Sequence, residues 1–89
     1  MSSPSSELQV SLPDGVDLHA RPAAQFVRTA MTFDARIAVA AGDREADAKS
    51  LLAVLSLGAK GGSALRLRAD GEDAPAALET LAGCVSTLR

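Results

Sequence analysis

The chain has 89 residues, of which 47% are hydrophobic and only 2% aromatic, and its formal net charge at pH 7 is −2. A chain of this length forms one small domain, whose core must consist mainly of aliphatic side chains. A net negative charge, together with the absence of Trp and Tyr, argues against nucleic-acid binding. A single histidine and a single cysteine, Cys84, provide no metal-ligand spacing and no internal disulfide, so we expect neither a metal nor a cofactor.

The N-terminus is polar. We expect residues 1–6, MSSPSS, to form a flexible tail ahead of one domain that spans residues 7–89. The segment MSSPSSE lacks the apolar region of a secretion signal, and no apolar run approaches the length of a membrane span. The expectation is a cytoplasmic protein without membrane insertion.

The first half of the chain predicts a strand, a helix and a hairpin. Residues 7–13 alternate apolar and polar positions, as a half-buried strand does. Residues 19–33 place apolar side chains at helical spacing, and Pro22 fits only in a first helical turn, so this helix should begin at His19 or Ala20. In residues 35–49, an alternating apolar pattern followed by Gly42 and Asp43 predicts a hairpin with a two-residue turn, although its return arm, residues 44–48, has poor strand propensity.

The second half predicts a helix, a strand and a helix. Ser50 as N-cap and Gly58 after the last turn bracket a short helix. Residues 63–70 alternate apolar and charged side chains, as a strand with one wet face does. Asp73 should cap a last helix that carries Pro75 in its first turn. The order β-α-β-β-α-β-α predicts an α+β fold, in which helices cover one face of an antiparallel sheet.

The chemistry is concentrated at His19. Free backbone N–H groups and the positive end of the helix dipole converge at a helix start, and both favour an anion there. Arg21 adds a guanidinium whose geometry suits phosphate oxygens. The spacing of His19 and Arg21 at the helix start is compatible with reversible phosphorylation of the imidazole. It is also compatible with an incidental histidine at a helix cap beside a solvated arginine.

Three segments resemble one protein family. LHARPAAQFV, residues 18–27, resembles the active-centre signature of HPr, the histidine-containing phosphocarrier of the bacterial phosphoenolpyruvate-dependent sugar phosphotransferase system. AKSLLAVLSLG, residues 48–58, resembles the family's second motif, and ADGEDAPAALETL, residues 69–81, the start of its last helix. The resemblance covers residues 8–88. It implies an open-faced β-sandwich with a four-stranded antiparallel sheet and three helices on one face.

The resemblance also implies residue roles. His19 would accept a phosphoryl group on Nδ1 from phosphorylated Enzyme I and pass it to IIA domains of sugar permeases, as a carrier and not an enzyme. Arg21 would stabilise the phosphoryl group. Ser50 would match the serine that an HPr kinase/phosphorylase modifies in some bacteria, beside its role as a helix cap. The alternative function is that of a regulatory HPr paralogue, which acts through phosphorylation-dependent protein binding. We expect the protein to be a monomer.

The short helix after Ser50 is apolar nearly all round, which predicts either full burial or an exposed docking face. The resemblance implies that Leu52 and Leu55 are exposed near His19, whereas Leu51 and Val54 turn inward or lie at the margin. A purely structural leucine cluster is the alternative. The predicted partner-binding residues are Arg28, Lys49, Leu51, Leu52 and Leu55.

One residue departs from the family pattern. Asp17 stands where the family usually has glycine, on a loop that is longer than the compact family form. Its carboxylate could repel a phosphoryl group or simply face solvent.

Overall fold

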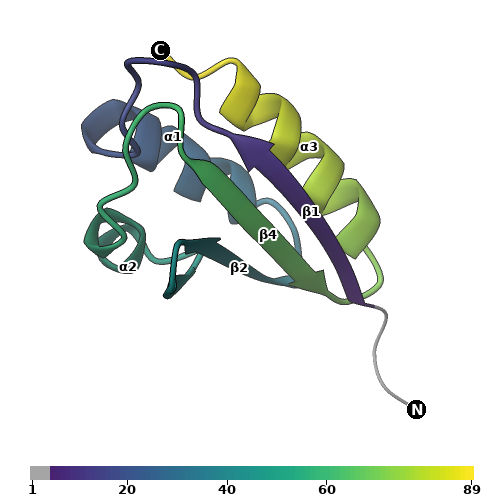
Figure 1. Ribbon diagram of the computed structural model, residues 1–89. Coiled ribbons are helices and arrows are strands. Elements are labelled where there is room, and N and C mark those ends of the chain that lie inside the picture. The colour runs from purple at the N-terminus through teal and green to yellow at the C-terminus, as the bar shows by residue number, and fades with distance from the viewer. Residues whose placement is uncertain (1–4) are drawn as a thin grey trace.

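The computed structural model describes residues 5–89. Seven elements follow one another: β1 Ser5–Ser11, α1 Ala20–Ala30, β2 Arg36–Ala41, β3 Arg44–Asp47, α2 Leu51–Ser56, β4 Ala64–Asp70 and α3 Ala74–Ser86 (Figure 1). The predicted element order is therefore confirmed.

The N-terminal boundary differs from the prediction. Ser5 and Ser6, which we expected in a flexible tail, belong to β1 and pair with Asp70 and Ala69 of β4. Backbone hydrogen bonds make this pairing, so it needs no apolar side chains and leaves no trace in the hydrophobic pattern. Residues 1–4 of the predicted tail lie outside the described residues.

The four strands form one antiparallel sheet in the order β1-β4-β2-β3. Leu8, Leu67 and Val39 are aligned across β1, β4 and β2, so their side chains share one face. All three helices lie on that face of the sheet, behind the strands in Figure 1. The predicted fold class, an open-faced α+β sandwich, is confirmed.

The core lies between the sheet and the helices. It is built from aliphatic residues around one fully buried aromatic side chain, Phe26 of α1, while Phe33 is only partly buried. The arrangement holds α1 and its N-terminus firmly on the sheet.

Two connections show how turns and acids shape the fold. Gly42 has a φ of +62°, and this left-handed conformation closes the predicted β2–β3 hairpin. Asp73 precedes α3 as predicted, but its carboxylate makes no capping hydrogen bond. It accepts instead from the backbone N–H groups of Asp34 and Ala35, each at 2.9 Å, and so fixes the connection between α1 and β2.

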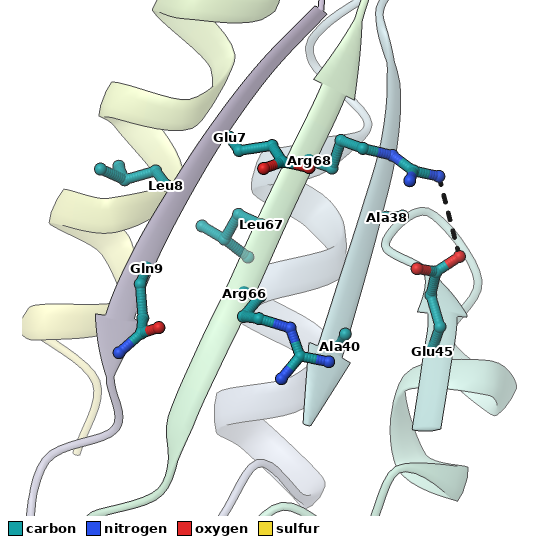
Figure 2. A pocket seen from close by; sticks show the side chains of 9 residues that line it. All are labelled: Glu7, Leu8, Gln9, Ala38, Ala40, Glu45, Arg66, Leu67 and Arg68. Carbon is teal, nitrogen blue, oxygen red and sulfur yellow. Dashed lines mark ion pairs between the residues drawn. The ribbon is translucent and has the colours of Figure 1, made fainter. Parts of the chain in front are cut away.

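The other face of the sheet is polar. Figure 2 shows Arg66 and Arg68 of β4 between Gln9 and Glu7 on β1 and the small Ala38 and Ala40 of β2. The Arg68 guanidinium crosses β2 and lies 3.9 Å (Nη2 to Oε1) from the Glu45 carboxylate on β3 (Figure 2). Charges of both signs line the shallow depression of about 340 Å³ on this face, and His19 is not among its residues.

Candidate functional site

His19 is the N-cap residue of α1. Its backbone is extended, with φ −148° and ψ 161°, and the helix begins at Ala20, within the predicted range. The His19 side chain is exposed and makes no capping hydrogen bond. The imidazole is therefore accessible to a partner protein at the start of a helix.

The backbone bends sharply directly after His19. Ala20 has a φ of +49°, and it is the one non-glycine residue between 5 and 89 with a positive φ. The left-handed conformation costs an alanine about 1–2 kcal/mol. Leu18 and Ala23, both buried, anchor the chain on either side of the bend and hold it in this conformation.

The floor of the site comes from the end of α2 and the loop that follows it. The backbone N–H of Leu18 donates to the carbonyl of Ala59 at 2.9 Å, and the N–H of His19 donates to the carbonyl of Asp17 at 2.9 Å. A cavity of about 190 Å³ lies beside the histidine. It is lined by Asp17, Leu18, His19, Leu55, Gly58, Ala59 and Lys60.

Asp17 is engaged with this neighbouring loop. Its Oδ1 accepts a hydrogen bond of 2.8 Å from the backbone N–H of Gly61, and its Oδ2 lies 3.8 Å from Nζ of Lys60. Of the two alternatives for Asp17, neither included this contact: the carboxylate is exposed but bonded to the neighbouring loop. Sequence reasoning missed the contact because the residues that meet at the hydrogen bond are 44 positions apart.

Arg21 lies exposed in the first turn of α1, two residues after His19. The ion pairs among residues 5–89 are Lys60 with Asp17 and Arg68 with Glu45, and Arg21 belongs to neither. The role of Arg21 toward a phosphoryl group stays a prediction.

The leucines of α2 agree with the expectation except for Leu55. Leu52 is 76% exposed and Val54 is fully buried, both as expected. Leu51 is 43% exposed, whereas Leu55 is only partly exposed and lines the cavity beside His19. Leu51 thus lies at the margin, one of the two places expected for it, whereas Leu55 is less exposed than the resemblance implied, because it packs against the core.

The remaining predicted partner-binding residues divide into two cases. Arg28 is exposed in the last turn of α1. Lys49 is partly buried, and its Nζ donates to the carbonyl of Phe33 at 2.6 Å, so the ammonium is held by the α1–β2 connection. Met31, the C-cap residue of α1, is 63% exposed.

Ser50 caps α2 as predicted. Its Oγ accepts a hydrogen bond of 3.2 Å from the backbone N–H of Ala53, and its side chain is partly exposed. The cap satisfies one of the unpaired donors of the first helical turn.

The described part of the chain contains no group of three or more His, Cys, Asp or Glu side chains that could hold a metal ion. Within the same residues, no helix combines the length and the apolar character that crossing a membrane requires.

The comparison with known families agrees with this geometry. The model described as "PTS HPr component phosphorylation site" matches residues 5–87, and so includes His19 and the surrounding loops. The chain belongs to the HPr family. The HPr family assignment predicted from the three motifs is confirmed.

Named relatives and solved structures support the same conclusion. The chain is 40% identical to phosphocarrier protein HPr of Haemophilus influenzae over 84 residues, which cover 94% of this chain and 96% of that protein. It is 45% identical over 82 residues to the multiphosphoryl transfer protein of Xanthomonas campestris, covering 92% of this chain but only 10% of that longer protein. The crystal structure of HPr from Bacillus anthracis superimposes with a TM-score of 0.87 at 35% identity, covering 92% of this chain and 98% of that one.

The relatives' names also establish the class of activity. HPr relatives of nearly full coverage are named phosphocarrier proteins, so this chain is a phosphoryl carrier of the phosphotransferase system and not an enzyme.

Proposed function

We propose that His19 is the phosphorylated residue, that phosphorylated Enzyme I is its donor and that IIA domains of sugar permeases are its acceptors in the cytoplasm. The Nδ1 lone pair of the imidazole attacks phosphorus, the bond between phosphorus and the donor breaks, and the ring proton stays on Nε2. Transfer to a IIA domain reverses these events on the carrier. One observation carries the proposal: the only histidine of an HPr-family chain stands exposed at the start of α1.

The surroundings of His19 suit a phosphoryl group that must be held and then released. Backbone N–H groups at the start of α1 provide hydrogen-bond donors to an anion, and the dipole of the helix adds a favourable field. Arg21 supplies the only guanidinium in the first turn. A partner protein completes the site, because phosphoryl transfer is promoted mainly by positioning and by charge stabilisation.

The test is phosphorylation of the purified protein by phosphoenolpyruvate and Enzyme I. We expect one phosphoryl group per chain, labile in acid and stable in base, as a phosphohistidine is. Because there is one histidine, His19→Ala removes every imidazole and should abolish labelling. Labelling that persists in His19→Ala would reject the assignment.

We place the docking surface for these partners on α2 and the adjoining part of α1. Leu51 and Leu52 are exposed there, together with Met31 and Arg28. The helices α1 and α2 pack against each other, and Leu55 of α2 lines the cavity beside His19. An apolar centre with a basic rim fits a partner that delivers an anionic phosphoryl group.

Ser50 is the proposed site of modification by an HPr kinase/phosphorylase. Its partial exposure and its place directly before Leu51 and Leu52 support this role. A phosphate at that position would add negative charge to the rim of the docking surface and repel acidic partners.

The carrier is proposed to act as a monomer, which size-exclusion chromatography would test against the chain mass of 9.1 kDa.

A further inference from the structure

Two loops carry the backbone of the site. The histidine loop comprises residues 12–19, and the facing loop comprises residues 57–63. Backbone hydrogen bonds join them at one end, where the N–H of Leu12 donates to Ser63 at 2.9 Å and the N–H of Gly62 donates to Leu12 at 3.0 Å. The bond from Leu18 to Ala59 joins them at the other end. The loops therefore form one connected unit beneath His19.

The two loops also touch backbone to backbone. A Cβ atom built on Gly61 would lie 2.6 Å from the backbone nitrogen of Gly15 and 2.7 Å from that of Val16. Only glycine permits this approach, since both contacts are shorter than real Cβ atoms tolerate. The approach brings the N–H of Gly61 within reach of the Asp17 carboxylate, at 2.8 Å from Oδ1.

Asp17 connects the facing loop to the histidine through a single residue. Its side chain accepts from Gly61, while its own carbonyl accepts from the backbone N–H of His19 at 2.9 Å. We propose that Asp17 is a positioning residue for phosphoryl transfer, which fixes the backbone of His19 relative to the end of α2. This role rests on the proposed function of His19.

The hydrogen bond, and not the ion pair, provides the positioning. The side chains of Lys60 and Asp17 are 78% and 51% exposed and lie 3.8 Å apart, and ion pairs of this kind contribute little. A carboxylate that accepts from a backbone N–H makes a shorter and stronger bond. Asparagine would keep an oxygen acceptor for Gly61 and remove the negative charge, which separates the two effects.

The experiment compares Asp17→Ala with Asp17→Asn. Two quantities are measured: the amide hydrogen-exchange rate of Gly61, and kcat and KM for phosphorylation of each variant by Enzyme I. Loss of the hydrogen bond in Asp17→Ala should raise exchange at Gly61 about tenfold. It should lower kcat by about threefold to tenfold, with a smaller change in KM, because the ring is less well placed after docking. Asp17→Asn should restore both quantities.

One control variant tests the cause. Asp14→Ala removes another exposed carboxylate from the same loop and should behave as the unmodified protein does. A loss of kcat in this control equal to that in Asp17→Ala would overturn the proposal, as would a failure of asparagine to rescue.

The outcomes separate this inference from the proposed function. If the unmodified protein accepts no phosphoryl group at His19, the proposed function is rejected, and the positioning role of Asp17 is rejected with it. If the unmodified protein is phosphorylated and Asp17→Ala has the same kcat or the same Gly61 exchange rate, only the positioning role is overturned. Thermal unfolding of each variant excludes a general loss of structure as the cause.

Discussion

Ser50 has a structural contact and a proposed regulatory role that substitutions can separate. Ser50→Ala removes the hydrogen bond from Ala53 and should lower the free energy of unfolding by about 1 kcal/mol. Ser50→Asp keeps an oxygen that can cap α2, but it adds negative charge beside Leu51. We therefore expect Ser50→Asp to retain the melting temperature and to slow transfer from Enzyme I. Circular dichroism and transfer kinetics provide the two measurements, and unaltered kinetics would mean that the position is only a cap.

The roles of individual polar residues were predictable only where their partners are local. Ser50 and Ala53 are three positions apart, so the N-cap followed from the sequence. Asp73 contacts Asp34 across 39 positions, and Asp17 contacts Gly61 across 44. A local sequence pattern cannot indicate which distant backbone N–H group will donate to a carboxylate, because only the fold brings the two together. The sequence therefore predicted roles for His19 and Arg21 but not the contact between Asp17 and Gly61.

At the scale of the element, α2 combines a buried side with an exposed one. Leu52→Glu places a charge on a residue that is 76% exposed, so it should weaken binding to Enzyme I while the melting temperature changes little. Leu55→Glu should weaken binding and also lower the melting temperature, because Leu55 is partly buried against the core. Titration calorimetry and thermal unfolding measure the two effects.

Val54→Ala is the matched control within the same helix. Val54 is fully buried, so its truncation should destabilise the fold by about 1–3 kcal/mol and leave the exposed leucines in place. If Leu52→Glu lowered the melting temperature as much as Val54→Ala, the leucines of α2 would be a packed cluster and not a docking surface.

Six of the seven elements were predictable because each carries a hydrophobic period or a pair of end signals, whereas β3 was predicted only from the turn at Gly42 and Asp43. The strand β4 shows this most simply: Leu65, Leu67 and Ala69 are buried while Arg66 and Arg68 are exposed. The errors concern short or polar segments. The polar start of β1 is held by backbone pairing, and α2 has only six residues. Tertiary contacts decide such segments.

At the scale of the whole molecule, stability depends on an aliphatic core around one fully buried aromatic ring. Phe26→Ala should remove about 3–5 kcal/mol. That is a large part of the stability of a small domain, which is about 0.05–0.15 kcal/mol per residue. Phe26→Leu, which leaves a smaller gap, should cost much less. Urea unfolding followed by circular dichroism suits a chain without Trp and Tyr, and near-equal unfolding midpoints for the two variants would contradict this account.

The direction of β1 determines how far from His19 a tether or domain joined to the N-terminus enters the fold. Ser5 pairs with Asp70 at one end of the sheet, and Leu12 meets Ser63 at the other end, from which the chain runs on to α1 (Figure 1). The seven residues of β1 span about 20 Å between these ends. A tether or a fused domain that joins ahead of Ser5 therefore enters remote from the imidazole. Immobilisation through the N-terminus should leave His19 open to soluble partners, whatever surface holds the chain.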